Sequence, residues 1–197
     1  WVVALYFAQG LPYGIVQLMG PVYFTAMGAS PALIGLTSLI GLPWNLKLLW
    51  SPLVDLLGKR RTWVATMLAL LVCGSGLLAL TTSFDLGTME LARLGTVPGV
   101  LLAGGVVLIL IAFLSATADV AEDAFYMDAL SQREQALHLG TRVAAYRVAM
   151  LTASGLLVYL AGRFGWTLGF GLAALLMAAV AAICVLSLPA PPHVPRE

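Results

Sequence analysis

The chain has 197 residues, of which 61% are hydrophobic and only 10% are charged, and its mean hydropathy is +0.98. A water-soluble domain of this length needs many more charged residues on its surface, so the composition excludes that class and predicts an integral membrane protein. The net charge is +1 and the ten Lys and Arg residues are dispersed apart from one short run, so the sequence carries no sign of nucleic-acid binding. The chain starts at Trp1 without a Met and is apolar at once, which favours a piece of a longer protein over a signal peptide.

The first predicted membrane span covers about residues 1–24. Four polar side chains fall within roughly 80° of arc on its helical wheel: Tyr6, Gln9, Tyr13 and Gln17. This polar face either lines a cavity or forms hydrogen bonds between helices.

The second predicted span, 32–54, contains Lys47. The ammonium group either extends to the membrane surface or forms a cationic wall of a cavity. A tight loop follows, with an acid, a glycine and the densest positive charge of the chain: Asp55, Gly58, Lys59, Arg60 and Arg61. Short basic loops stay in the cytoplasm, so this loop predicts the orientation of the protein.

The third predicted span is 63–80, an outer loop occupies 81–97, and the fourth span is 98–130. The fourth span carries the most informative residues, because Asp119, Glu122, Asp123 and Tyr126 share one arc of the helix. An Asp at the centre of a membrane helix costs roughly 2.5 to 3.5 kcal/mol, so these acids indicate a water-filled path.

Three carboxyl groups on one face repel each other when ionised, so at least one of Asp119, Glu122 and Asp123 is expected to hold a proton near neutral pH. This favours a role in proton coupling. The alternative is that the two aspartates pair with cations of other spans and hold the helices together. Asp128 points to the opposite side of the helix and is expected to pair with the basic loop as a conformational latch.

The fifth and sixth predicted spans are 141–162 and 166–188, followed by a polar tail or linker at 189–197. Arg147 lies well inside the fifth span and is the best candidate for a counter-charge or a contact to a substrate anion, because its planar guanidinium suits a carboxylate or phosphate. Arg142 stands at the predicted start of that helix and is expected to be solvated. Residues 1–188 therefore form one six-helix domain, which could be built from two inverted repeats of three helices.

Several segments resemble the AmpG-type muropeptide permeases and the related acetyl-coenzyme A transporter branch of the major facilitator superfamily. They are YFAQGLPYG at 6–14, GLPWNLKLLWSPLVD at 41–55 with the following loop, FLSATADVAEDAF at 113–125 and TRVAAYRVAM at 141–150. The fourth helix of that family commonly reads like SATQDIAxDAY. Asp119 and Asp123 match its acid pair, whereas Ala118 replaces the usual Gln and Glu122 is an additional acid.

The resemblance implies an all-α transporter of twelve helices, of which this chain is the N-terminal half, with alternating access to a central cavity. The expected function is proton-coupled secondary transport of an anionic sugar- or nucleotide-containing metabolite, with a muropeptide-like substrate favoured. The expected partners are the substrate, protons, the lipid bilayer and the C-terminal six-helix half. The expected location is a bacterial inner membrane, with both ends in the cytoplasm.

Two other classes compete with a transporter. A half-length protein could act as a membrane scaffold, which the absence of a second half permits. A membrane-embedded transferase is disfavoured, because the sequence has no His at membrane depth, no Cys or His cluster with metal spacing and no glycine-rich phosphate loop. No catalytic residue, metal site or cofactor is therefore expected.

Overall fold

The computed structural model describes residues 1–56, 58–91 and 95–189 of the chain, without the side chains of 55, 91 and 95. Six helices in this part of the chain are long and apolar enough to cross a membrane: Val2–Ala26, Pro31–Leu49, Arg60–Thr81, Gly99–Ala129, Gln132–Phe164 and Trp166–Ser187. The predicted all-α membrane fold is confirmed. The polar tail expected at 189–197 lies almost entirely outside the described residues.

Three of the spans are interrupted by turns of other helix types. The first span consists of α1 (Val2–Gly14), the π-helix η1 (Ile15–Met19) and α2 (Gly20–Ala26). The second consists of α3 (Pro31–Thr37), the 3₁₀ turn η2 (Ser38–Gly41), α4 (Leu42–Leu46), the 3₁₀ turn η3 (Lys47–Leu49) and α5 (Ser51–Leu56). Ser30 caps α3, since its hydroxyl accepts a hydrogen bond from the backbone N–H of Leu33.

Of the remaining four spans, the third, fourth and sixth are continuous α-helices and the fifth contains a π-helix. They are α6 (Arg60–Thr81), α7 (Gly99–Ala129), the composite of α8 (Gln132–Leu151), the π-helix η4 (Thr152–Leu157) and α9 (Val158–Phe164), and finally α10 (Trp166–Ser187). The turn between α9 and α10 is made at Gly165, whose φ of 96° is in the region that glycine adopts without strain.

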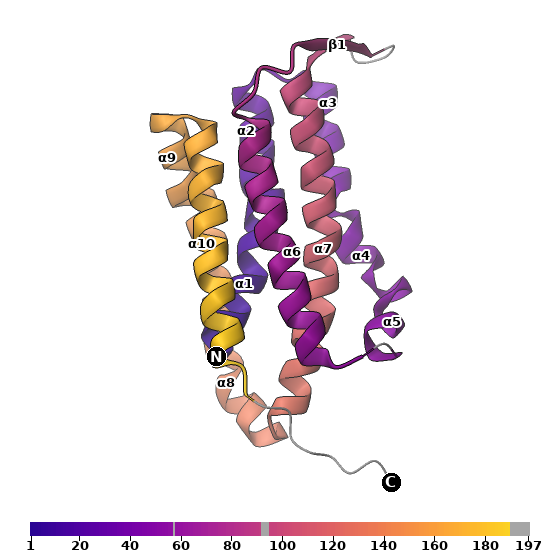
Figure 1. Ribbon diagram of the computed structural model, residues 1–197, viewed down its shortest axis with the longest axis vertical. Helices are drawn as coiled ribbons and strands as arrows, with labels where there is room; N and C mark the ends of the chain where they lie inside the picture. Colours follow the sequence, from indigo (N-terminus) through magenta and orange to yellow (C-terminus); the bar gives the residue numbers. More distant parts are fainter. Residues whose placement is uncertain (57, 92–94, 190–197) are drawn as a thin grey trace.

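A small β-hairpin lies at the end of the bundle opposite the N-terminus (Figure 1). Strands β1 (Thr88–Leu91) and β2 (Gly95–Pro98) pair antiparallel, with Thr88 opposite Pro98. The sequence predicts only a loop in this region. The end of α10 and the N-terminus lie together at the other end of the bundle, where the α5–α6 connection and the start of α8 also lie (Figure 1).

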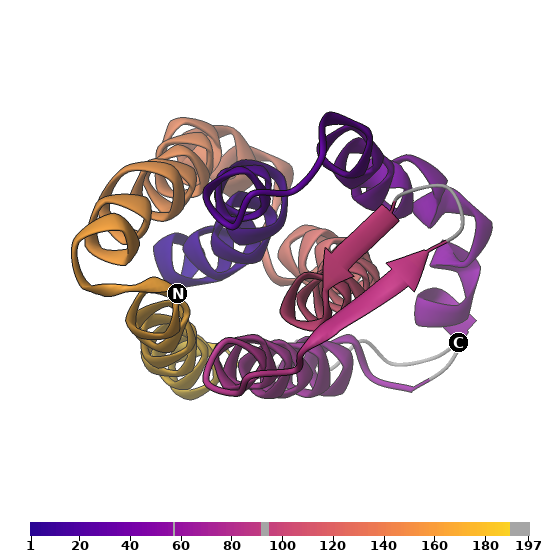
Figure 2. The ribbon, with the colours of Figure 1, turned by 90° about the horizontal axis from the view of Figure 1, so that it is seen from above.

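The first span is the most buried of the six, because α1 packs against α7, α8 and α10 (Figure 2). Glycine allows the closest of these contacts: a Cβ on Gly10 would lie 2.6 Å from the carbonyl oxygen of Tyr146 in α8. The second and fifth spans are the least buried. Large apolar side chains such as Leu48, Leu49 and Leu151 are accordingly exposed on them.

Candidate functional site

A cavity of about 330 Å³ opens between α1, α7 and α8, and most of its lining is polar or aromatic. It is lined by Tyr6, Gln9, Asp119, Asp123, Arg142, Val143, Tyr146 and Arg147. The sequence predicts five of these as site residues, namely Gln9, Asp119, Asp123, Arg147 and, on the polar face of the first span, Tyr6. The structure thus brings polar residues from three membrane spans to one place.

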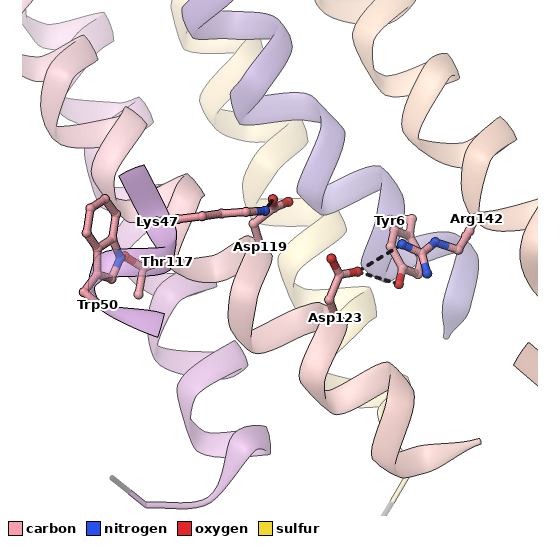
Figure 3. A network of polar contacts seen from close by, with 7 residues as sticks. All are labelled: Tyr6, Lys47, Trp50, Thr117, Asp119, Asp123 and Arg142. Carbon is pink, nitrogen blue, oxygen red and sulfur yellow. Dashed lines mark hydrogen bonds and ion pairs between the residues drawn. The ribbon is translucent and has the colours of Figure 1, made fainter. Parts of the chain in front are cut away.

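Asp119 forms an ion pair with Lys47, which reaches it from the second span (Figure 3). Lys47 is the first residue of η3. A second contact with α7 follows at Trp50, whose indole N–H donates a hydrogen bond of 3.1 Å to the hydroxyl of Thr117. Both charged side chains are mostly buried, with 28% of Lys47 and 15% of Asp119 exposed. Lys47 therefore contacts an acid of α7 and does not extend to the membrane surface.

Asp123 is held by two groups from other helices (Figure 3). The hydroxyl of Tyr6 donates a 2.9 Å hydrogen bond to its Oδ1 atom, and the guanidinium of Arg142 lies 3.2 Å from the same oxygen. The Arg142 guanidinium also lies over two aromatic rings, 4.4 Å from the centroid of Tyr6 and 5.2 Å from that of Tyr126. Each aspartate of the pair is thus neutralised by a cation from a different span.

The prediction that Arg142 is solvated is wrong. Helix α8 begins at Gln132, well before the predicted start at 141, so Arg142 lies in the interior of the helix, where it can reach Asp123. A sequence signal for this start exists in Ser131 and Glu134, which form a capping box. The Ser131 hydroxyl accepts a hydrogen bond from the Glu134 backbone N–H, and the Glu134 carboxylate accepts one of 2.8 Å from the Ser131 backbone N–H.

Glu122 and Tyr126 share the acid face in the sequence, but neither lines the cavity. Glu122 is completely buried, and among the described residues neither of its carboxyl oxygens has a hydrogen-bond partner. Tyr126 is buried beside Tyr6, with ring centroids 5.5 Å apart, and its hydroxyl donates to the backbone carbonyl of Gln135. Glu122 is therefore a buried acid behind the site.

Arg147 faces the cavity from α8 and makes no ion pair or hydrogen bond with the residues that the structure describes. It is the cavity cation that is not already bound to an acid there. Tyr13 lies in an aromatic group outside the cavity lining, 5.0 Å from the ring of Trp44 and 6.0 Å from the ring of Tyr146. This group forms an aromatic border to the same site, because Tyr146 belongs to both.

Gln17 lies away from the cavity, against Gly41 of the second span: a Cβ on Gly41 would lie 2.8 Å from its amide nitrogen. The helical wheel used for the prediction assumes an α-helix throughout. A π-helix begins at Ile15 and holds more residues per turn, so Gln17 is rotated off the face that carries Tyr6 and Gln9.

The basic loop meets the C-terminal end of α7, where Asp128 lies. Arg60 forms a 2.6 Å ion pair with Asp128 and donates a 3.1 Å hydrogen bond to the backbone carbonyl of Ala124. Gly58 has a φ of 82°, which turns the chain before α6, while Lys59 and Arg61 are exposed. The side chain of Asp55, also expected in this loop, lies outside the described residues.

The chain matches a protein family and is similar to several known proteins. Residues 1–152 match the family of acetyl-coenzyme A transporter 1. An uncharacterized protein of Haemophilus influenzae is 38% identical over 88% of this chain and 39% of its own length. The anhydromuropeptide permease of Escherichia coli K12 is 33% identical over 81% of this chain and 31% of its own length.

The matched part of the chain spans 39% of the length of the first relative and 31% of the second. The family match covers the first four spans and all of α8, which include every residue of the cavity lining. On this match the chain belongs to the acetyl-coenzyme A transporter family, in the branch that includes the AmpG-type permeases.

Proposed function

We propose that this chain is the N-terminal half of a secondary transporter of the major facilitator type, and that its cavity binds an anionic metabolite. The observation that carries this proposal is the position of Arg147, an exposed residue of the fifth span, on the wall of a polar cavity between otherwise apolar helices. Ionisable residues at membrane depth are costly and mark substrate or ion pathways. The relatives named above support a transport role over an enzymatic one.

The charge in the cavity favours a negative substrate. Lys47 neutralises Asp119 and Arg142 neutralises Asp123, so the net charge left at the cavity wall is that of Arg147. A guanidinium binds a carboxylate or phosphate through two parallel hydrogen bonds. Acetyl-coenzyme A and the anhydromuropeptides, after which the relatives are named, are both anionic and contain sugar, which agrees with this charge.

The wall beside Arg147 suits a sugar-containing ligand. Tyr146 lies one residue before Arg147, and its ring is part of the aromatic group with Tyr13 and Trp44. Aromatic rings present a flat apolar face, while Gln9 supplies amide donors and acceptors from α1. We therefore favour a muropeptide-like substrate over a purely ionic one.

The C-terminal half would complete this cavity. The second and fifth spans expose most of their surface, whereas the first span, which includes α1, is 67% buried. A second six-helix unit that covers them would give the twelve-helix arrangement and the alternating access that the resemblance implies. By itself the 197-residue chain is then expected to insert into the membrane but not to transport.

The orientation follows from the basic loop. Lys59, Arg60 and Arg61 lie at the end of the bundle that also holds the N-terminus, and the positive-inside rule assigns this end to the cytoplasm. We place the protein in a bacterial inner membrane, with the β-hairpin outside. The ion pair of Arg60 with Asp128 would then act as a latch on the cytoplasmic side.

The test is uptake by the full-length protein in proteoliposomes, with labelled anhydromuropeptide and labelled acetyl-coenzyme A as probes, with and without a pH gradient. Arg147→Ala is expected to abolish saturable binding. Arg133→Ala removes an exposed arginine from the first turn of the same helix and is the matched control. Absence of uptake for both probes would favour a scaffold, and normal binding by Arg147→Ala would remove the proposed anion contact.

A further inference from the structure

Glu122 is the acid on this face of α7 that takes part in neither of the two ion pairs described above. Its side chain is completely buried on α7, and both carboxyl oxygens lack a hydrogen-bond partner among the described residues. Asp119 and Asp123, by contrast, each contact a cation at the cavity. A buried acid next to two paired acids therefore needs a separate explanation.

The surroundings of Glu122 supply negative charge or apolar surface. Asp119 and Asp123 are its charged neighbours on α7, and Cys184 of α10 is the titratable neighbour on the opposite side. From α1, the hydroxyl of Tyr6 is already donated to Asp123. From α6, which packs along α7, the buried residues of its first half are Val64, Met67, Leu68 and Leu71.

These surroundings suit a carboxylic acid and not a carboxylate. An ionised carboxylate removed from water requires a cation or several hydrogen-bond donors, and a group without them takes up a proton instead. The two aspartates have the reverse requirement. A proton on Asp119 or Asp123 would end an ion pair and leave Lys47 or Arg142 uncompensated in the membrane.

We propose that Glu122 is the proton-carrying group of the transporter, whereas Asp119 and Asp123 remain ionised and fix the positions of the second and fifth spans on α7. This inference rests on the proposed transport function and assigns the coupling ion to one residue. In the state described here Glu122 is the neutral acid. In the alternate state its O–H bond breaks and the proton passes to water that has entered beside α7.

The release of this proton would change the site for a physical reason. The new negative charge lies one residue from Asp123 and three residues from Asp119, so like-charge repulsion disfavours the present packing of α7. Water must then reach Glu122, or one of the two ion pairs must open. Proton release is thereby tied to a change in helix packing, as a carrier requires.

The experiment compares two assays on the full-length protein in proteoliposomes. One is accumulation of labelled anhydromuropeptide driven by a pH gradient, and the other is exchange of the same compound without a gradient. Glu122→Gln mimics the neutral acid, so we expect exchange to persist and gradient-driven accumulation to be lost. Glu90→Gln neutralises an exposed acid of β1 and is expected to change neither assay.

A second measurement does not depend on transport. A protonated carboxylic acid gives an infrared C=O band that shifts in heavy water and is distinct from the carboxylate bands. We expect this band at neutral pH in the wild-type protein and in Asp119→Asn, and its loss in Glu122→Gln. This measurement remains informative if a variant loses activity by misfolding, because the spectrum of the wild-type protein by itself must contain the band.

Three results would overturn the inference: accumulation by Glu122→Gln at the wild-type level, no acid band in the wild type, or a band that Asp119→Asn removes and Glu122→Gln retains. These results are distinct from a failure of the proposed function, in which the wild-type protein neither exchanges nor accumulates the compound.

Discussion

The contact between α1 and α8 gives the most direct test of the packing, through Gly10→Ala. The new Cβ atom would lie 2.6 Å from the carbonyl oxygen of Tyr146 and 3.1 Å from the Cβ of Ala149, whereas ordinary contacts begin at 3.4 Å. The Tyr146 oxygen belongs to the helix backbone, so a rotamer change cannot relieve this contact. The two helices must therefore separate by about 0.8 Å or tilt.

Such overpacking costs about 1 to 3 kcal/mol. Replacing a helical glycine by alanine returns about 0.5 to 1 kcal/mol, so the net loss in free energy of unfolding is expected to be about 0 to 2.5 kcal/mol. Gly76→Ala in α6 is the matched control, because a Cβ there meets no atom within 4 Å. It should be neutral or stabilising by up to about 1 kcal/mol.

Both variants can be measured by denaturant titration of the detergent-solubilised protein, followed by tryptophan fluorescence. A Gly10→Ala protein as stable as Gly76→Ala would refute the close approach of α1 and α8. Because Tyr146 lines the cavity, Gly10→Ala should also weaken substrate binding, and this weakening should be absent in the control.

Three further predictions concern the ion pair of Lys47 with Asp119, the role of Arg147 and the topology. Lys47→Met leaves Asp119 buried without its cation and should destabilise the protein by about 3 kcal/mol in the same titration. Adding Asp119→Asn to Lys47→Met should restore most of that loss, and additive losses would exclude the ion pair. Arg147→Lys retains the charge but loses the planar guanidinium, so binding of an anionic probe in equilibrium dialysis should weaken by about tenfold with no loss of thermal stability. A matching fall in thermal stability would indicate a structural role for Arg147 instead. Single cysteines at Lys59 and Thr88 should react with an impermeant reagent from opposite sides, the first only after the cells are opened, and labelling of position 59 in intact cells would reverse the topology.

Periodicity and hydropathy were sufficient to predict the six spans, because a bilayer imposes a length and an apolar surface that can be read without tertiary information. The same reasoning predicts Asp119, Asp123 and Arg147 as site residues, since charges at membrane depth are rare. The β-hairpin was missed, because β1 and β2 are only four residues each and depend on pairing with one another.

The errors within the site have local causes. Arg142 was assigned to solvent because the start of α8 was placed at 141, although the capping box at Ser131 signals an earlier start. Gln17 was assigned to the polar face because a single wheel cannot represent a π-helix. The burial of Glu122 could not be predicted, since its position on the wheel next to Asp123 does not say which neighbouring helix covers it.

The two π-helices of the first and fifth spans have a consequence for insertions and deletions. Segments η1 and η4 contact each other, and each holds one residue more per turn than an α-helix would. A single-residue insertion in each ancestral helix would produce such a pair, and an insertion in one helix alone would turn its two ends relative to the other. Deletion of one residue from both segments should therefore be better tolerated than deletion from either one, because only the double deletion keeps the two helices in step.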